Sequence, residues 1–191
     1  PQVAASFERA CERLRDAGVE FQDVDIPHAG DIAHVYLHIV LPEAAAYHAR
    51  TLDSRPGDYT PDVRLRLEMG RYMLAEDYRR ALRGREVLTK EVDDRLKGRD
   101  GLLLPSLAVP ATKLGARVVR VGESEESVRN ITLRLTQLFN LTEHPVITIP
   151  CGHAADGLPI GVQLAGHRHQ TTRLLEVARA LEPSLSPGTS H

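Results

Sequence analysis

The chain has 191 residues, 42% of them hydrophobic and 26% charged, an ordinary balance for one globular domain or two. Its formal net charge is −2 and its acidic and basic residues are interspersed, which argues against nucleic acid and membrane surfaces as partners. No stretch approaches about 18 consecutive apolar residues, so no membrane-spanning helix is expected.

Cysteine usage and the first residues bear on the cellular compartment. Cys11 and Cys151 are the two cysteines and have no C-x-x-C spacing, so the sequence indicates neither a disulfide framework nor a cysteine zinc site. The first residues lack the pattern of a secretory signal peptide. We therefore expect a protein of the reducing cytoplasm.

The N-terminal part of the chain predicts a helix, a strand and a second helix. Residues 3–17 carry apolar side chains at three- and four-residue spacing and end before a glycine, which is typical of a helix. Residues 19–26, closed by Pro27, have the β-branched and aromatic content of a strand. Residues 31–49 predict the second helix, which Pro42 should kink or interrupt.

The middle of the chain predicts the largest helical block. Residues 50–61 are rich in Asp, Ser, Pro and Gly and predict a loop. From residue 62 to residue 97 apolar side chains recur at helical spacing. A break near residues 70–75 should divide this block into two helices.

The C-terminal part supplies the expected sheet. Residues 101–105, 146–149 and 160–164 are short apolar runs, which are typical of strands covered on both faces by helices. With the strand expected near the N-terminus, they indicate the α/β class and a mixed sheet of about four strands with helices packed over it.

The end of the chain predicts a helix and a tail. Residues 171–181 have the apolar spacing of a closing helix. Residues 184–191 lack core-forming side chains and are expected to be flexible. Residues 1–183 are therefore assigned to the folded domain.

Histidines suggest one possible metal site. His34 and His38 are four residues apart on an expected helix, with His28, Glu43 and His48 nearby, and this spacing can place two imidazoles on one face. The metalloprotease pattern H-E-x-x-H is absent. Histidines that lie on the surface or line a pocket are the preferred interpretation, and no metal is expected.

Cys151 is one possible nucleophile. It follows a proline that ends an apolar run, and a thiol there could attack a substrate if His153 were oriented toward it. The alternative is a packing residue, because buried cysteines usually act as small hydrophobes.

Ser106 and Lys113 are a second possibility, since a lysine of lowered pKa can deprotonate a serine. The segment around them is bounded by prolines, and sequence proximity does not position a base. A loop without a catalytic dyad is therefore preferred.

The segment TQLFNLTEHPVITIPCGHAADGLPIGVQLAG, residues 136–166, carries a longer pattern. It matches T-x-x-x-N-x-x-x-x-P-x-x-x-x-P-x-G followed by G-L-P-x-G-x-Q-L-x-G, which is similar to the C-terminal motif of the amidase-signature hydrolases. The matching residues are Thr136, Asn140, Pro145, Pro150, Gly152, Gly157, Leu158, Pro159, Gly161, Gln163, Leu164 and Gly166. Other segments resemble the same family in the same order, over residues 4–183.

The resemblance implies a part of a serine hydrolase. In the family the catalytic unit is a Ser, a second Ser before a cis peptide, and a Lys, in a Gly/Ser-rich region upstream of everything matched here. No such run occurs in these residues. The resemblance therefore implies the C-terminal portion of an amidase domain, with no catalytic residue of its own and inactive alone. Its implied partners are the N-terminal catalytic part of the same protein and a small-molecule amide, with no cofactor.

Arg85 and two departures from the family pattern concern the substrate. The resemblance implies that Arg85 could meet a substrate carboxylate, although a helix-surface ion pair is the alternative. Leu133 stands where amidotransferase subunits carry an Asp that can hold the glutamine amino group, which argues against glutamine as ammonia donor. Glu143 and His144 stand where many members have Gly-Leu, which puts a charge and an imidazole beside a strand entry.

Two classes of function follow. The first is a part of an amidase, contributing pocket walls and packing, with Arg85, Cys151 and His153 as candidate substrate-binding residues; part of an allophanate hydrolase or of an amidotransferase is a variant of it. The second is a stand-alone, non-catalytic α/β binding module. Unpaired strand edges in a C-terminal portion would favour self-association, so a homo-oligomer is possible.

Overall fold

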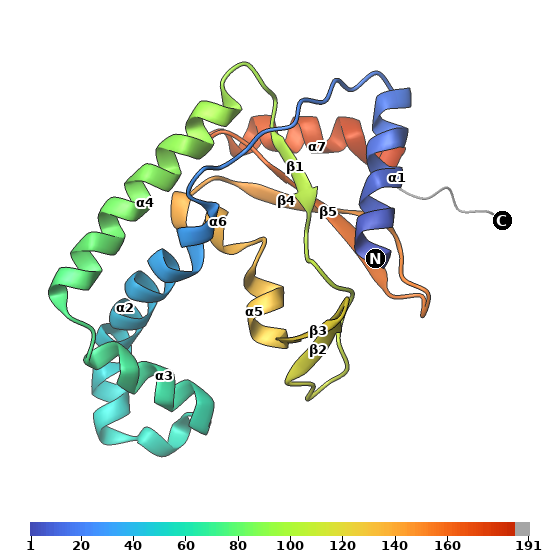
Figure 1. Cartoon of the computed structure of the whole chain (residues 1–191). Helices are drawn as coiled ribbons and strands as arrows, with labels where there is room; N and C mark the ends of the chain where they lie inside the picture. The colour runs from blue at the N-terminus through green and yellow to red at the C-terminus, as the bar shows by residue number, and fades with distance from the viewer. Residues whose placement is uncertain (186–191) are drawn as a thin grey trace. The chain divides into compact units, whose positions relative to one another are not determined.

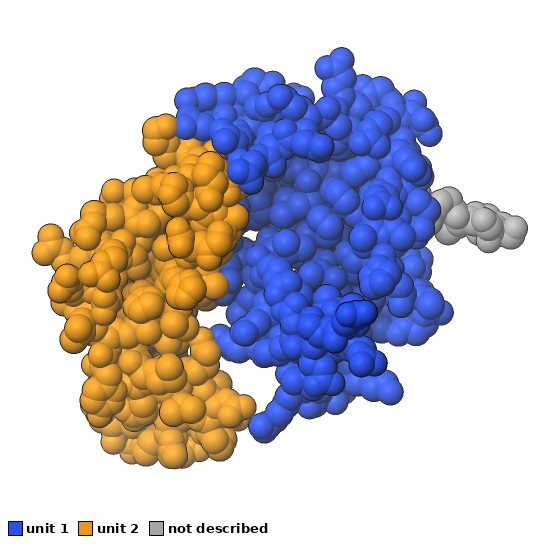
Figure 2. Space-filling model, in the orientation of Figure 1, with its two compact units in different colours: residues 1–25, 92–191 blue, residues 26–91 orange. Residues whose placement is uncertain are grey.

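The computed structural model describes residues 1–185, shown as a ribbon in Figure 1. The chain forms two compact units, coloured separately in Figure 2. Unit 1 consists of residues 1–25 and the residues from 92 onward, and unit 2 consists of residues 26–91. None of the helices in residues 1–185 is long and apolar enough to cross a membrane.

A three-stranded antiparallel sheet forms the centre of unit 1. Strand β5 (Pro159–Ala165) lies between β1 (Leu102–Pro105) and β4 (Val146–His153). Both outer strands pair with β5 in antiparallel fashion, so they run in the same direction without pairing with each other. Their outer edges have no partner strand within the described residues.

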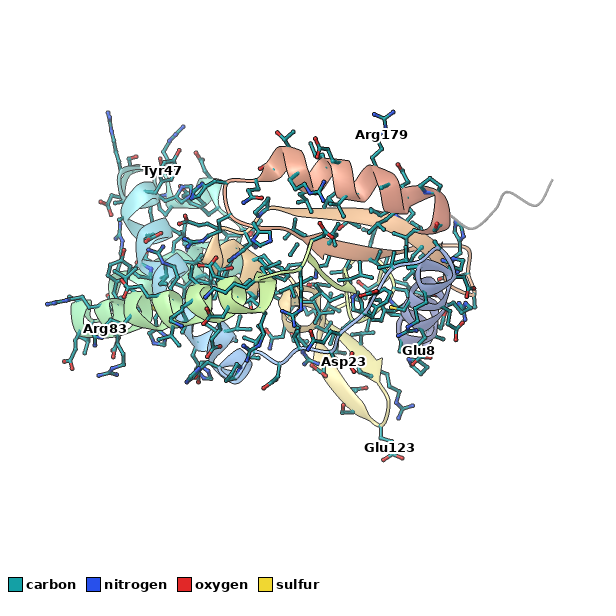
Figure 3. All side chains as sticks on the ribbon, turned by 90° about the horizontal axis from the view of Figure 1, so that it is seen from above. Glu8, Asp23, Tyr47, Arg83, Glu123 and Arg179 are labelled. Atoms are coloured by element: carbon teal, nitrogen blue, oxygen red, sulfur yellow. The ribbon has the colours of Figure 1, made fainter. Side chains whose placement is uncertain are left out.

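One face of this sheet is covered by two helices, α1 (Gln2–Asp16) and α7 (Thr171–Leu185). Figure 3 shows Arg179 of α7 pointing away from the strands, as expected for the polar side of an amphipathic helix. Both helices and both long strands contribute buried side chains to one core, which contains Val3, Ala10, Leu14, Ile149, Cys151, Ala154, Ile160, Val162, Leu164, Leu174, Ala178 and Leu185. A fully buried leucine or valine of this kind contributes about 1.5–3 kcal/mol.

A hairpin and two short helices connect β1 to β4. Strands β2 (Val118–Val121) and β3 (Ser124–Ser127) pair as a separate two-stranded sheet. Gly122 lies in their turn with φ +62°, a left-handed conformation that favours glycine. Helices α5 (Val128–Leu133) and α6 (Gln137–Thr142) then lead into β4.

Unit 2 is helical. It contains the 3₁₀ turns η1 (Ala29–Asp31) and η2 (Pro56–Asp58), and the helices α2 (Ile32–Ser54) and α3 (Pro61–Arg71). Helix α4 (Ala75–Leu96) begins in unit 2, and its residues from 92 onward belong to unit 1.

Helix α2 continues through Pro42, which was expected to kink or interrupt it. Next to this proline α3 approaches α2 very closely: a Cβ on Gly70 would lie 2.1 Å from the backbone oxygen of Leu41 and 2.9 Å from Cβ of Ala45. Packing of the two helices at this point stabilises α2 against the loss of one backbone hydrogen bond at the proline.

Two N-terminal predictions are wrong. Residues 19–26 form no strand, because no strand among the described residues lies beside them, and Phe21 and Val24 remain 36% and 38% exposed. Residues 50–54 continue α2 instead of opening a loop. The division of the middle block into two helices, α3 and α4, is confirmed.

The α/β architecture with helices packed over a sheet is confirmed. The strand arrangement differs from the expected mixed sheet of about four strands: the central sheet has three strands, all antiparallel, and the hairpin is separate. Strand direction and pairing depend on tertiary contacts that apolar runs do not encode. Of the expected tail, residues 184 and 185 belong to α7, and residues 186–191 lie outside the described part of the chain.

Candidate functional site

The face of the sheet opposite the core carries a pair of hydroxyl groups. Side chains alternate along β4, so Thr148 lies on the face opposite the buried Ile149. Ser106 directly follows β1, and its hydroxyl donates to the Thr148 hydroxyl across 3.3 Å. A Cβ on Gly161 would lie 2.8 Å from Cγ2 of Thr148 and 3.1 Å from Oγ of Ser106. This face of the sheet therefore carries two adjacent hydroxyl groups beside Gly161, where a side chain would come too close to Thr148 and Ser106.

Gln163, on this same face, is 2% exposed, and its amide nitrogen donates two hydrogen bonds. Its Nε2 atom donates to the backbone oxygen of Pro105 across 3.1 Å and to that of Leu135 across 2.8 Å. One side chain thus ties β5 to the end of β1 and to the connection between α5 and α6. This explains why the sequence motif contains a glutamine here, since a buried amide must find partners.

Ser106 does not form a catalytic dyad with Lys113. Lys113 is exposed, and the Ser106 hydroxyl has Thr148 as its hydrogen-bond partner. No hydrogen bond between Ser106 and Lys113 occurs in the described part of the chain. The preferred interpretation of this segment, a loop without a catalytic dyad, agrees with this geometry.

Cys151 lies in the core between β4 and helix α1, with 2% of its surface exposed. Burial raises the pKa of its thiol, against the opposing charges of Arg13 and Arg9. Its backbone oxygen accepts a hydrogen bond from Nη2 of Arg13 across 2.9 Å. These surroundings suit a packing residue better than a nucleophile. A raised pKa leaves less of the thiol as thiolate, and the thiolate is the reactive form.

His153 and Arg85 lie in different surroundings. His153 is exposed at the end of β4, beyond a bulge between Pro150 and Gly152, and no hydrogen bond joins it to Cys151 among residues 1–185. Arg85 lies half-buried on α4 within unit 2, where its backbone oxygen accepts a hydrogen bond from Thr89. The candidates thus come from both units.

The histidines near the start of α2 line a cavity of about 410 Å³ inside unit 2. Its walls come from η1, α2 and α4 and combine charged, imidazole and apolar side chains: His28, Asp31, His34, Val35, His38, Asp77, Arg80, Ala81, Gly84, Val87 and Leu88. Gly84 lets the two helices approach, since a Cβ there would lie 2.8 Å from Cγ2 of Val35. Pocket-lining histidines were the preferred interpretation of this cluster.

Several side chains around this cavity have partners within the protein. His28 pairs with Glu91, and this hydrogen bond raises the pKa of the imidazole. His38 shares a hydrogen bond with the backbone oxygen of His34, and Glu43 accepts one from the Tyr78 hydroxyl. No group of three His, Cys, Asp or Glu side chains within residues 1–185 is arranged to hold a metal ion.

One buried polar network was not predicted from the sequence. His144 is 5% exposed and lies between the hydroxyl of Thr142 and the carboxylate of Asp93, which also binds Arg168. The available signal was the Glu143–His144 pair in place of Gly-Leu. The sequence indicated a charge and an imidazole beside a strand entry, but the partner of His144 on α4 is about fifty residues away in the sequence and could not be inferred.

Comparison with known proteins gives the family. A family model described as Amidase matches residues 1–175. The chain belongs to the Amidase family. An amidase from Pseudomonas putida is 37% identical over 160 residues, which cover 83% of this chain and 34% of that protein. A glutamyl-tRNA(Gln) amidotransferase subunit from Koribacter versatilis is 28% identical, over 97% of this chain and 43% of that protein.

Solved amidase structures agree. A crystal structure of an amidase superimposes with a TM-score of 0.91 at 32% identity, covering 96% of this chain and 42% of the other. The chain thus spans about a third to two fifths of the length of these relatives. The sequence motif of residues 136–166 corresponds in space to α6, β4 and β5, where Gln163 and Gly161 organise the polar face of the sheet.

Proposed function

We propose that this chain is the C-terminal segment of an amidase-signature serine hydrolase that cleaves a carboxylic amide C–N bond. It contributes pocket walls and structural packing, and it is inactive alone. The observation that carries this is the amidase match over residues 1–175, combined with coverage of only 34–43% of the relatives.

The chemistry comes from the rest of the enzyme. A serine oxygen attacks the amide carbon, and a lysine acting through a second serine removes the serine proton and delivers a proton to the leaving amine. Backbone N–H groups stabilise the oxyanion. Water then attacks the acyl-serine and releases the acid. No metal or organic cofactor is required, and no side chain of this chain forms or breaks a bond.

The residues of this chain act by position. Arg85 is a half-buried residue whose guanidinium suits a substrate carboxylate, and exposed His153 suits a pocket rim. Cys151, on the core side of β4, acts as a packing residue. Ser106 and Thr148 add hydroxyls that can bind polar groups of the amide.

The decisive experiment compares this chain with the polypeptide that contains it. The intact mass of the native, untagged protein should be about twice that of this chain or more. That protein should hydrolyse a simple aryl amide, whereas residues 1–191 expressed alone should not. A native mass equal to this chain would support the non-catalytic module instead, and amide hydrolysis by the chain alone would contradict the assignment of the catalytic residues to another segment.

The amidotransferase variant has one specific argument on each side. The similarity to the glutamyl-tRNA(Gln) amidotransferase of Koribacter versatilis covers 97% of the chain. Leu133 stands where the expected glutamine-binding Asp would be, so glutamine should be a poor ammonia donor. The two variants are separated by measuring the glutaminase activity of the complete protein with and without Leu133→Asp. Activity that this substitution restores or raises would favour the amidotransferase.

The open edges of β1 and β4 support the proposed partner. Unpaired edge strands associate with other strands, and the N-terminal catalytic part would satisfy them in the whole enzyme. The isolated chain should therefore self-associate in light scattering after size-exclusion chromatography, and a stable monomer would contradict this. Both cysteines are free and buried, which suits a cytoplasmic enzyme.

A further inference from the structure

His144 is enclosed by three segments of unit 1. Its side chain is 0% exposed. Nδ1 lies 2.8 Å from the hydroxyl of Thr142 at the end of α6, and Nε2 lies 3.2 Å from Oδ1 of Asp93 on α4. Arg168, between β5 and α7, holds the same carboxylate with Nε 3.3 Å from Oδ1 and Nη2 2.7 Å from Oδ2.

The hydroxyl of Thr142 has two acceptors within reach. It lies 3.0 Å from the backbone oxygen of Leu138 and 2.8 Å from Nδ1 of His144, but it carries one proton. When His144 is neutral, Nε2–H donates to Asp93, and Nδ1 must accept the Thr142 proton. When His144 is protonated, Nδ1–H donates to Thr142, whose hydroxyl then turns to the oxygen of Leu138.

We propose that His144 is a buried proton-binding site that titrates within the folded protein, with Thr142 as a hydroxyl rotor that satisfies both protonation states. The change needs no heavy-atom movement, because every partner of either state is already within 3.2 Å. A single proton from solvent is taken up at Nδ1, no covalent bond other than N–H forms, and Asp93 remains ionised throughout.

Charged neighbours set where this titration falls. Burial lowers the pKa of His144, the hydrogen bond and charge of Asp93 oppose this, and Arg168 and His167 lower it further. Burial alone would raise the pKa of Asp93, but the hydrogen bonds and charges of Arg168 and His144 outweigh it and hold the pKa below its usual value. At neutral pH the site is therefore a neutral imidazole beside an ion pair of Asp93 and Arg168.

Proton uptake changes one connection of the fold. The positive imidazole donates a charge-assisted hydrogen bond to the Asp93 carboxylate, which links the turn between α6 and β4 to α4, but desolvation of the charged ring outweighs this attraction and makes the protonated site the less stable one. This turn sets the entry of β4, the strand that carries Thr148. A leucine, as in many members of the family at this position, could not respond to pH.

The test is an NMR titration of the His144 imidazole nitrogens in the natural polypeptide that contains these residues. We expect a neutral Nε2–H tautomer near pH 7 and a transition to the doubly protonated ring at lower pH while the backbone spectrum stays that of the folded state. An Nδ1–H tautomer, or a folded protein whose His144 never takes up a proton, would overturn the inference.

Three variants move this transition in stated directions. Arg168→Met should raise the pKa of His144 because it removes a neighbouring cation, and Asp93→Asn should lower it because it removes the anion. Thr142→Val should lower it, since Nδ1–H then lacks an acceptor. Thr132→Val is the matched control, because Thr132 also donates to backbone oxygens one turn earlier but shares no hydrogen bond with a histidine within residues 1–185. Equal behaviour of the Thr142 and Thr132 variants would contradict the rotor.

A stability measurement covers the case in which a variant folds poorly. Because the pKa of His144 is lowered on folding, the free energy of unfolding should fall as pH drops below the ordinary histidine range, relative to His144→Leu. The difference should level off once the folded state binds the proton too. A difference that keeps growing with acid would mean that only the unfolded chain is protonated, which excludes a native proton site.

Discussion

Arg13 on α1 donates a hydrogen bond from Nη2 to the backbone oxygen of Cys151 on β4, across 2.9 Å. The same guanidinium reaches the end of α7, where Nε lies 3.0 Å from the oxygen of Ser184 and Nη2 lies 3.0 Å from that of Leu185. One side chain thus binds three backbone oxygens in two other elements. It satisfies carbonyls at a helix end that have no partner in the helix itself.

Replacing Arg13 should destabilise unit 1 strongly. Arg13→Met keeps most of the apolar stem but leaves three carbonyls without their charged donor, and we expect a loss of about 2–4 kcal/mol in the free energy of unfolding. Chemical denaturation followed by circular dichroism measures it. Arg179→Met, an exposed arginine on α7, is the control and should change little. Equal effects of the two substitutions would contradict the role of Arg13.

Glu143 should be replaceable by glycine with a gain in stability. It has φ +61°, a left-handed conformation in which a side chain is strained and glycine is not. Glu143→Gly should therefore raise the free energy of unfolding by about 0.5–1 kcal/mol. Glu143→Gln, which keeps the strain and removes the charge, should give no gain. A loss of stability in the glycine variant would show that the conformation carries no strain.

Gln163→Leu should destabilise the sheet although leucine has a similar size. The substitution leaves the oxygens of Pro105 and Leu135 without their donors in a buried place, and we expect a loss of about 2–4 kcal/mol. Thermal melting measures the change. Gln170→Leu, at an exposed glutamine before α7, is the control. An unchanged melting temperature for Gln163→Leu would mean that solvent reaches the two carbonyls.

Cys151 should be unreactive in the folded protein. Burial raises the pKa of its thiol, so less thiolate is present near pH 8 than for an ordinary cysteine, and 2% exposure limits access. Alkylation by iodoacetamide, followed by mass spectrometry, should be much slower in buffer than in denaturant. Rapid alkylation of the folded protein would instead support a catalytic or exposed thiol.

His28 should titrate above the ordinary histidine range. The hydrogen bond to Glu91, and then the charge of that carboxylate, raise the pKa of the imidazole. Because the pKa is raised in the folded state, the pairing contributes its full stabilisation below the ordinary histidine pKa. This stabilisation is lost as pH rises through the pKa of the folded state. NMR titration of His28 measures this, and Glu91→Gln should return the pKa toward its usual value. Equal titration curves for the two proteins would contradict the pairing.

Part of the fold could be predicted from local patterns. The spacing of apolar residues predicted α1, the pair α3 and α4, and α7, because helix formation depends on periodic burial within one segment. The same reasoning failed at residues 19–26, where strand-like composition found no pairing partner among the described residues. It also missed the hairpin of β2 and β3, in which β3 consists of polar residues and no side chain is fully buried.

The candidate site residues were likewise predicted only in part from the sequence. The motif predicted that residues 136–166 matter together, and it located Gln163 and Gly161 without giving their partners. Arg85 lies on a helix as expected, whereas β4 extends beyond the expected residues 146–149 to His153, and the roles of both residues in substrate binding stay predictions. The link between His144 and Asp93 joins distant segments, so no local pattern indicated it.

By itself the sequence determined the family, the longer helices and the order of the motif residues, because each follows from a local pattern or from a match along the chain. Only the tertiary structure decided the three-stranded antiparallel pairing, the burial of Cys151, the three acceptors of Arg13 and the enclosure of His144. These depend on which distant segments come together, and hydrogen bonds and desolvation act between neighbours in space, whatever their separation in the chain.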